Sequence, residues 1–395
     1  LPQLGIQLAR LINNRYYFDY NATSPLAESV MNWLPNGDLL FANPSSIHTS
    51  GKKSKRYINE TKNFLKETFS TSAEYKIFFH SGATEGVNSL VKGFAQRAFA
   101  EKERVHFVHS CVDHSCVYNL RDELELYGHE VSTFGVDENG DYDIDEVITL
   151  LKKSSSPTLL NFTWVNNENG VVWSLSDLSR IKEETNCFIH VDSVQSIGKI
   201  EGWNTLNQVV DAYTFSGHKF GAMKGVGFSF VKEDFPFCSM MRGGGQQEGM
   251  RSGTENTNGI YSLKLALEEV IKNQNFNELN RSKNYIEDSV NSVLSGDARI
   301  VSKNASRRNG NTIYLVLPGK KADILITAFD LAKMDVSSGS ACSSGAILPS
   351  RVLLAMGVHE DDAKSALRFS FSYELRLEEA QEYAEKIISV LKRFL

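Results

Sequence analysis

The sequence predicts an α/β protein, with a mainly parallel seven-stranded sheet in a large domain and a smaller α+β domain toward the C-terminus. Two observations predict this fold class. Up to residue 231, short β-branched or aromatic runs alternate with helix-length segments, which is typical of repeated βαβ units. Beyond about residue 260, long helical runs dominate. We therefore expect a large domain over residues 16–260 and a small domain over residues 1–15 and 261–395.

Composition excludes several classes of protein. The chain has 395 residues, enough for two domains, and its net charge of −6 offers no basic surface for nucleic acid or anionic lipid. No apolar run is long enough to span a bilayer, and residues 1–15 lack the apolar core of a signal peptide. The five cysteines have neither disulfide-like nor metal-like spacing. We expect a cytoplasmic enzyme with free thiols and with no metal, nucleic-acid partner or membrane contact.

The first 69 residues predict an N-terminal helix or arm, a turn with a short helix, a polar loop at residues 41–46 and a long helix. Residues 1–14 predict a short amphipathic helix or arm, and a turn at residues 21–25 precedes a short helix. Residues 51–69 carry apolar side chains at helical spacing and predict a long helix.

The central part of the chain predicts the sheet. Strands are expected at residues 76–79, 105–109, 130–134, 158–165, 187–191, 212–215 and 227–231, with helices at 87–100, 115–127, 145–153 and 176–186. Ligands of parallel sheets bind at the carboxyl ends of the strands. Polar residues follow these strand ends at Ser81 to Thr84, His114, Asn166, Asn167, Asp192 and Ser216 to Lys219. The sequence therefore predicts one site to which several strands contribute.

The last part of the chain predicts the small domain. Helices are expected at residues 260–273, 276–294, 322–331 and 377–395, and strands at 312–317 and 366–371. The second strand contains Arg368, and a loop at residues 336–344, rich in Ser and Gly, contains Cys342.

Two features near the strand ends suggest chemistry. Backbone N–H groups and hydroxyls in the loop from Ser81 to Gly86 could hold a phosphate, although a capped βα turn would have the same composition. Asp192 ends one buried strand and Lys219 follows the next, as a pyridoxal phosphate (PLP) enzyme requires. The lysine forms a Schiff base, and the acid keeps the pyridine nitrogen protonated. An isolated pair of this kind is more often a buried acid and a surface lysine.

Eight motifs occur in an order that is known from one family. They are Phe18-Asp19-Tyr20-Asn21-Ala22-Thr23, Ser81-Gly82-Ala83-Thr84-Glu85, Val165-Asn166-Asn167-Glu168, His190-Val191-Asp192 with Gln195-Ser196, Ser216-Gly217-His218-Lys219, Met250-Arg251-Ser252-Gly253-Thr254, Ser337-Ser338-Gly339-Ser340-Ala341-Cys342 and Leu367-Arg368-Phe369-Ser370. With them, the chain resembles the NifS/IscS-type cysteine desulfurases. These belong to the class V aminotransferase group of fold-type I PLP enzymes. The resemblance extends from about Phe18 to the C-terminus.

The resemblance implies roles for individual residues. Lys219, Cys342 and His114 would be catalytic, with Lys219 as Schiff-base lysine, Cys342 as nucleophile and His114 stacked on the cofactor ring. Thr254 would reach the phosphate bound by a neighbouring subunit, which implies a homodimer. Substrate would be held by Asn21, Asn167 and Arg368. The cofactor would be held by Ala83, Thr84, His114, Asn167, Asp192, Gln195, Ser216, His218, Lys219 and Thr254.

The implied reaction converts L-cysteine to L-alanine, leaves a persulfide on Cys342 and passes sulfur to an acceptor protein. The sulfur would be used in iron–sulfur cluster or thio-cofactor biosynthesis. Two alternatives stay open: another class V PLP enzyme, such as an aminotransferase, a selenocysteine lyase or a cysteine lyase, or a non-catalytic protein with this fold. Four positions depart from the family pattern without touching the implied catalytic residues, namely His80, Asn169, Met223 and Ser372.

Overall fold

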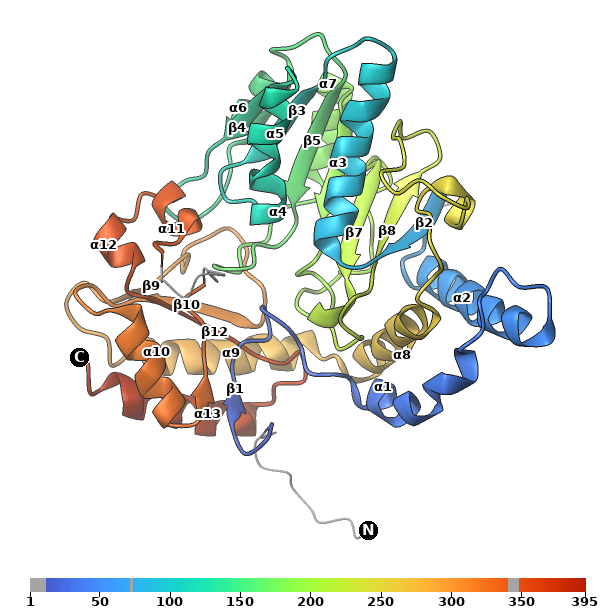
Figure 1. The fold of residues 1–395 in the computed structure, drawn as a ribbon. Helices are drawn as coiled ribbons and strands as arrows, with labels where there is room; N and C mark the ends of the chain where they lie inside the picture. The colour runs from blue at the N-terminus through green and yellow to red at the C-terminus, as the bar shows by residue number, and fades with distance from the viewer. Residues whose placement is uncertain (1–11, 72–73, 340–347) are drawn as a thin grey trace.

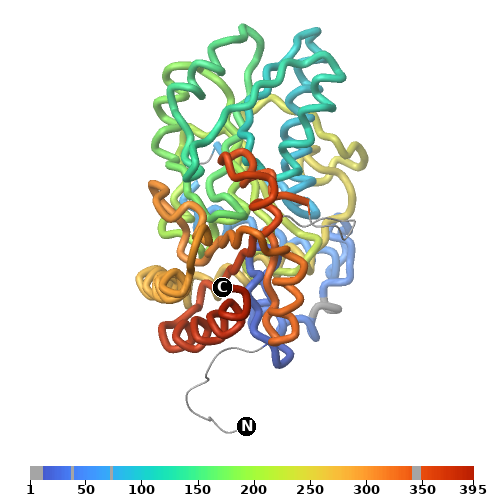
Figure 2. Tube along the Cα trace, turned by 90° about the vertical axis from the view of Figure 1, so that its left-hand side faces the viewer, coloured from blue at the N-terminus to red at the C-terminus, as the bar shows by residue number. Residues whose placement is uncertain are grey.

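A computed structural model describes residues 12–71, 74–339 and 348–395. A large sheet with helices on both faces occupies one part of the molecule, and a smaller helical and β region packs beside it (Figure 1). The N-terminal strand lies beside the C-terminal elements in both views (Figures 1 and 2). The C-terminal region is therefore completed by the beginning of the chain.

The large sheet contains the seven expected strands in the order β2-β8-β7-β6-β5-β3-β4. Strand β8 is antiparallel to both of its neighbours, and the other six strands run in one direction. The expectation of a mainly parallel sheet is confirmed. The strands are β2 (Tyr75–His80), β3 (His106–Ser110), β4 (Glu130–Phe134), β5 (Thr158–Thr163), β6 (Phe188–Asp192), β7 (Ala212–Ser216) and β8 (Gly227–Lys232).

Apolar side chains on these strands alternate between two hydrophobic cores, because successive residues of a strand point to opposite faces. Phe107 and Leu159 pack on the face covered by α3 (Ala83–Ala100), α4 (Ser115–Tyr118) and α5 (Leu120–Leu126). Val108 and Leu160 pack on the opposite face. That face is covered by α2 (Thr49–Thr68), α6 (Ile144–Leu151), α7 (Asp177–Thr185) and α8 (Thr257–Asn273).

Two helices differ from the expectation in ways that affect the site. The segment expected as one helix at 115–127 is divided at Asn119 into α4 and α5, since asparagine favours helix ends over helix interiors. Helix α3 begins at Ala83, four residues earlier than expected, so its first turn includes Thr84.

The small region has its own core around a three-stranded sheet. Strands β9 (Arg299–Ile300), β10 (Thr312–Val316) and β12 (Ala366–Ser370) pair in the order β12-β10-β9. Strand β1 (Tyr16–Tyr17) pairs with β11 (Met334–Asp335), and Phe18 joins the same core. The helices that contribute to this core are α9 (Phe276–Asn291), α10 (Ala322–Leu331) and α13 (Leu377–Leu391). Helix α1 (Glu28–Trp33) packs on α8, and α1, α11 (Arg351–Ala355) and α12 (Glu360–Ala363) contribute buried residues to the core of the large sheet.

The boundary expected near residue 260 falls inside α8. Residues Ile260, Leu263 and Leu267 of this helix belong to the core of the large sheet, and α8 packs against α2. The exact division into domains stays a prediction, and α8 is the element that connects the two parts.

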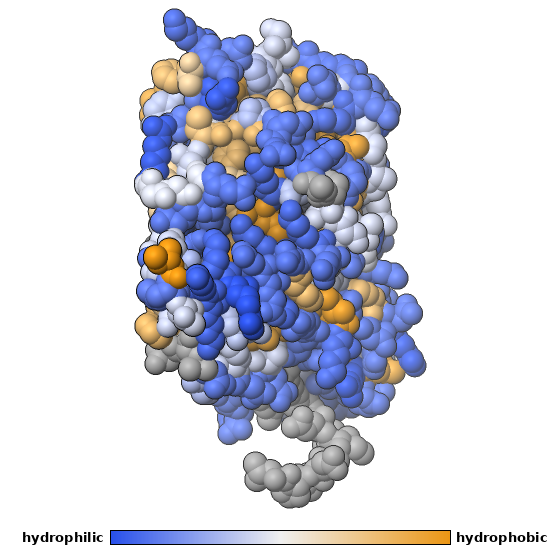
Figure 3. Space-filling view, turned by 90° about the vertical axis from the view of Figure 1, so that its right-hand side faces the viewer, coloured by the Kyte–Doolittle hydropathy of each residue, from blue (hydrophilic) through white to orange (hydrophobic). Residues whose placement is uncertain are grey.

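The surface gives two further observations. Within the described residues, none of the helices combines the length and the apolar character that crossing a bilayer requires. The face shown in Figure 3 is largely polar, with apolar side chains gathered in separate patches.

Candidate active site

The strand pleat places the site residues of the sheet on one face. On β6, His190 and Asp192 share the face of Phe188, and on β7, Thr214 and Ser216 share the face of Ala212. This is the face that α3 covers. The side chains at the carboxyl ends of these two strands therefore lie under the N-terminal end of α3.

A chain of buried hydrogen bonds crosses the sheet beneath that end of α3. His190 contacts Asn161 at 2.7 Å through Nδ1 and Thr214 at 2.8 Å through Nε2. Thr214 continues to Ser229 at 3.0 Å, and Ser229 to His80 Nε2 at 3.0 Å. We name these five residues the polar chain. Because burial lowers the pKa of His190 to about 3 and that of His80 to about 4, both rings are neutral near pH 7.

The polar chain has one consistent direction of donation. Asn161 Nδ2 donates to Asp113 at 3.0 Å, so Asn161 Oδ1 accepts from His190 Nδ1–H. His190 Nε2 then accepts from the Thr214 hydroxyl. Thr214 Oγ1 accepts from the Ser229 hydroxyl, and Ser229 Oγ accepts from His80 Nε2–H. The sheet thus holds a fully oriented row of polar groups under α3.

The start of α3 packs closely on this row. A Cβ atom on Gly86 would lie 2.6 Å from His80 Nε2 and 2.9 Å from Thr214 Cγ2. A residue without a side chain is therefore required for the first turn of α3 to approach the sheet.

We name Ser216 and the first turn of α3 the anion cradle. Among the described residues, no hydrogen-bond partner faces the buried Ser216 Oγ. A Cβ on Gly82 would come within 3.9 Å of this oxygen, so the hydroxyl lies beside the helix start. The first N–H groups of a helix have no acceptor within it, and the helix dipole favours an anion there. A phosphate fits these donors.

Charges near the cradle are already balanced. Glu85 in the first turn of α3 accepts from Arg251 Nε at 2.8 Å and from Ser81 N at 2.7 Å. Burial disfavours its charge, but Arg251 and Ser81 outweigh burial and lower the pKa of Glu85 to about 2. The carboxylate is therefore ionised near pH 7, and the Arg251 cation balances its charge beside the cradle.

Lys219 follows β7 and is close to Asp192. Burial, followed by the positive charge of Arg368, lowers the pKa of Lys219 to about 8. Burial raises the pKa of Asp192 to about 6, although Val194 N donates to it at 3.0 Å and Lys219 favours its charge. Lys219 Nζ donates to the carbonyl oxygens of Asn21 at 2.7 Å and Ala22 at 2.8 Å. The structure thus provides an amine that loses its proton readily.

Asn21 is the centre of a second group of polar contacts. Its side-chain nitrogen donates to Asn167 O at 3.1 Å and Thr312 Oγ1 at 2.9 Å. Its side-chain oxygen accepts from Lys199 Nζ at 3.2 Å, and Lys199 also donates to Gln195 Oε1. Gln195 Nε2 donates to Asn21 O at 2.9 Å. We name Asn21, Gln195, Lys199 and Arg368, with their acceptors, the Asn21 network.

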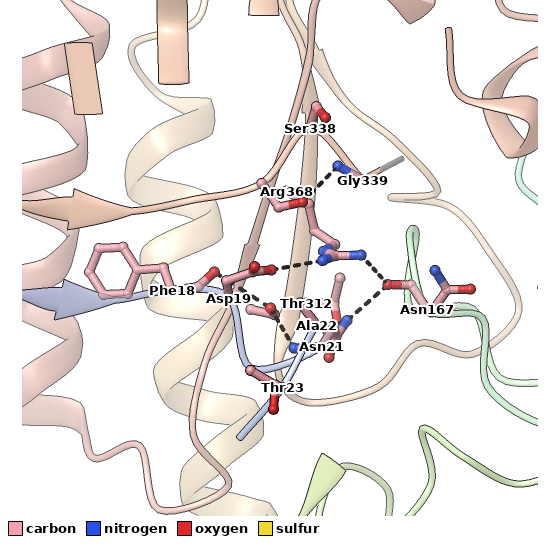
Figure 4. A network of polar contacts seen from close by, with 12 residues as sticks. Phe18, Asp19, Asn21, Ala22, Thr23, Asn167, Thr312, Ser338, Gly339 and Arg368 are labelled. Atoms are coloured by element: carbon pink, nitrogen blue, oxygen red, sulfur yellow. Dashed lines mark hydrogen bonds and ion pairs between the residues drawn. The ribbon is translucent and has the colours of Figure 1, made fainter. Parts of the chain in front are cut away.

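Arg368 on β12 brings the small region into this network (Figure 4). Its guanidinium donates to Asn167 O at 2.9 Å and forms an ion pair with Asp19 at 2.8 Å. Arg368 is 3% exposed. Within the described residues its Nε–H has no acceptor, so one donor of a buried cation is left for another anion.

His114 lies at the N-terminus of α4, where its Nδ1 accepts from Cys116 N at 3.2 Å. The surrounding protein, then the charges of Lys219 and Arg351, lower the pKa of His114 to about 4, so its ring is neutral near pH 7. Arg351, the first residue of α11, donates to the carbonyl oxygens of Cys111 and Asp113. This contact ties the chain after residue 347 to the turn that carries His114.

Described residues on either side of the Cys342 segment contact the buried side chains of Tyr314 and Glu168. Tyr314 OH donates to Glu168 at 3.2 Å and to Ser338 O at 3.2 Å. Ser350 Oγ donates to the same Glu168 oxygen at 2.5 Å. Cys342 itself lies outside the described residues.

The structure thus brings together most of the residues predicted from the sequence. Those at the sheet edge or in contact with it are Ala83, Thr84, His114, Asp192, Gln195, Ser216, His218 and Lys219, joined by Asn21, Asn167 and Arg368. His218 Nδ1 contacts Thr23 Oγ1 at 3.1 Å. Thr254 is exposed, three residues after Arg251. Sequence reasoning did not assign Lys199, Asp19 or Thr312, whose place in the network depends on contacts between distant segments.

The chain matches the family model described as aminotransferase class-V over residues 16–382. The chain belongs to the class-V aminotransferase family. A cysteine desulfurase of Cereibacter sphaeroides is 32% identical over 361 residues, covering 91% of each chain. The cysteine desulfurase IscS of Dictyoglomus turgidum is 32% identical over 386 residues, covering 96% of this chain and 94% of the relative.

Solved structures agree with this assignment. The NifS-like protein from Rickettsia africae superposes with a TM-score of 0.82 at 27% identity, covering 96% of this chain and 99% of the other. SspA in complex with cysteine gives a TM-score of 0.75 at 27% identity, covering 91% and 99%. The predicted resemblance to NifS/IscS-type enzymes and the fold-type I architecture are confirmed.

Proposed function

We propose that this protein is a PLP-dependent cysteine desulfurase that converts L-cysteine to L-alanine and leaves a persulfide on Cys342. The observation that carries the proposal is the convergence of Lys219, Asp192 and Arg368 at one sheet edge, beside an anion cradle. The full-length likeness to cysteine desulfurases supports the choice of reaction within the family.

The residues present fit PLP. Ser216, His218, Ala83 and Thr84 would hold its phosphate, because the cradle offers a free hydroxyl and helix N–H groups. Asp192 would pair with the ring nitrogen, Gln195 and Asn167 would lie on the side of the ring oxygen, and His114 would lie against the ring. When bound, PLP supplies an electron sink for charge that develops at the substrate α-carbon.

Lys219 is proposed to hold the cofactor and to move the α-proton of the substrate. Its pKa of about 8 means that the amine takes up and loses a proton near neutral pH. Arg368 is proposed to bind the substrate carboxylate, using its free Nε–H and the donor now directed to Asp19. Asn21 is 1% exposed and its side chain already contacts Asn167 and Thr312, so we propose that it positions these groups.

Cys342 is proposed to take the sulfur. An S–S bond forms between its thiolate and the substrate sulfur while the Cβ–S bond breaks. The carbon fragment gains a proton and leaves as alanine, so cysteine and thiol become alanine and persulfide without an added oxidant. A sulfur-acceptor protein would then remove the outer sulfur. The four described cysteines are free, which supports a reducing, cytoplasmic setting.

The test is to incubate the PLP-loaded protein with L-cysteine, quantify alanine and locate added sulfur by peptide mass spectrometry. We expect one added sulfur on Cys342. Cys342→Ala should keep the bound cofactor and lose about 10³-fold or more in alanine formation, whereas Cys238→Ser should keep both. Alanine formation at the normal rate by Cys342→Ala would overturn the nucleophile assignment. Amino transfer to a keto acid in place of sulfur transfer would favour the aminotransferase alternative.

The homodimer stays a prediction of the same proposal. Thr254 is exposed and would complete the phosphate site of a second subunit. In a mixture of Lys219→Ala and Thr254→Ala chains, heterodimers would contain one site with both residues intact. Activity recovered on mixing would support a shared site.

A further inference from the structure

Lys199 is a second buried lysine within the Asn21 network. It is 4% exposed and lies in the turn after β6. The turn depends on Gly198, which has φ of +73° and whose Cβ would approach Tyr373 and Val270 within 3.3 Å. A lysine is seldom buried without a specific set of acceptors.

Its two acceptors are both side-chain amide oxygens. Lys199 Nζ donates to Gln195 Oε1 and, at 3.2 Å, to Asn21 Oδ1. A lysine has two N–H donors even as a neutral amine, so it can satisfy both oxygens in either protonation state. Burial lowers the pKa of Lys199 far below its ordinary value, with the charges of Lys219 and Arg368 acting in the same direction.

This contact decides which way the Gln195 amide points. A side-chain amide can rotate by half a turn, exchanging its oxygen and nitrogen, and its neighbours select one orientation. With its oxygen on Lys199, Gln195 directs its NH₂ group to Asn21 O at 2.9 Å. The same carbonyl accepts from Lys219 Nζ at 2.7 Å. The Gln195 nitrogen and the Lys219 amine are therefore neighbours.

We propose that Lys199 is a positioning residue that keeps the Gln195 amide nitrogen facing the ring oxygen of the cofactor beside Lys219. This inference rests on the proposed function, because it concerns PLP bound at Lys219. If Gln195 turned over, its oxygen would face the Asn21 carbonyl and the ring oxygen, and acceptors would oppose each other. Lys199 excludes that arrangement.

The orientation has a measurable consequence. A hydrogen bond donated to the ring oxygen stabilises negative charge on that oxygen. It therefore favours loss of the proton that the ring oxygen shares with the nitrogen joining Lys219 to PLP. The pH midpoint of the visible absorbance of the loaded protein reports this proton. Lys199→Met has similar length and no donor, so we expect the midpoint to rise by about one pH unit, the size of one charge-assisted hydrogen bond.

The route through Gln195 is tested with a double variant. Gln195→Leu alone should raise the midpoint by a similar amount. If Lys199 acts through Gln195, then adding Lys199→Met to Gln195→Leu should add almost nothing. Fully additive shifts would overturn the positioning role and indicate a direct effect of the Lys199 charge.

Lys283→Met is the matched control, because it removes another buried lysine, one paired with Glu287 at 3.2 Å in α9. It should lower the urea midpoint of unfolding without moving the absorbance midpoint. If Lys199→Met fails to fold, Gln195→Glu replaces the amide nitrogen by oxygen and should raise the midpoint in its place. An unchanged midpoint in the variant that folds would overturn the inference. Absence of the visible band in the unaltered protein would overturn the proposed function itself.

Discussion

Two regions of the site use polar groups in opposite ways. In the Asn21 network, the donors of Asn21, Gln195 and Lys199 meet acceptors within the protein. In the anion cradle, the Ser216 hydroxyl is buried and lacks a partner among the described residues. The cradle nevertheless adjoins the polar chain, whose member Thr214 precedes Ser216 by two residues on the same face of β7.

The partnered donors of Asn21, Gln195 and Lys199 are in place before a ligand binds, whereas the Ser216 hydroxyl lacks its partner until then. Partnered groups hold one orientation, and breaking them leaves a buried atom unsatisfied at a cost of roughly 1–3 kcal/mol. An unpartnered hydroxyl reduces the stability of the free protein and gains a hydrogen bond when an anion arrives. We infer that the Asn21 network sets geometry and that the cradle supplies affinity for phosphate.

The largest effect is expected at Arg368, which belongs to the network and still has a free donor. Arg368→Met should lower kcat/KM for L-cysteine by about 10²–10³-fold, because removing a buried, hydrogen-bonded charge costs roughly 2–5 kcal/mol. Asp19→Asn removes the ion pair but keeps the guanidinium, and it should cost less than about tenfold. Steady-state kinetics measures both. An equal loss in the two variants would show that substrate binding depends on the ion pair rather than on the guanidinium.

An intermediate effect is expected for two hydroxyls on β7. Thr214→Val leaves His190 Nε2 and Ser229 without their partner, so the free energy of unfolding of the free protein should fall by roughly 1–3 kcal/mol. Ser216→Ala loses no partner and removes a buried, unpartnered hydroxyl, so it should leave this free energy unchanged or raise it. Denaturant unfolding measures both values.

For ligand binding, we expect the larger effect from Ser216→Ala and the smaller effect from Thr214→Val. Ser216→Ala should weaken binding of PLP by about tenfold, the value of one hydrogen bond to a charged group. Its affinity for pyridoxal, which lacks the phosphate, should stay unchanged and provides the control. A loss that is equal for both ligands would mean that Ser216 does not contact phosphate.

Much of this arrangement could be predicted from the sequence, because it follows local rules. Short apolar runs, rich in β-branched and aromatic residues, predict the seven strands, and the parallel order brings Asp192 and Ser216 to one edge. The antiparallel direction of β8 could also be predicted from the sequence. Only residues 217–226 separate β7 from β8, fewer than the dozen or more that a parallel crossover needs.

The contacts of the Asn21 network could not be predicted in this way. Asp19 and Arg368 are 349 residues apart, and Lys199 and Asn21 are 178 apart. Burial of Lys199 depends on the turn at Gly198 and on the approach of the N-terminal segment, and neither is encoded by local spacing. Tertiary packing, rather than any motif, decides which polar side chains are enclosed.

The smallest effect concerns the pH dependence of the polar chain. Burial, together with the nearby His80, lowers the pKa of His190 to about 3, whereas an unfolded histidine has a pKa of about 6.5. Between these values the unfolded chain binds a proton that the folded chain excludes. Stability should therefore fall as the pH falls below about 6.5. A protonated His190 could not accept from Thr214, so the chain of donation would break at this ring.

His190→Asn removes the group that binds this proton in the unfolded chain. Urea unfolding at several values between about pH 5 and pH 6.5 should show a slope of stability against pH that is smaller by up to one proton, or about 1.4 kcal/mol per pH unit. His359→Asn removes a surface histidine, whose side chain is 77% exposed, and should leave the slope unchanged. Equal slopes for the unaltered protein and His190→Asn would mean that the folded protein admits the proton. Protonation of His190 would then break the polar chain in acid. The contrast between the partnered polar chain and the unpartnered hydroxyl of the anion cradle would hold only near neutral pH.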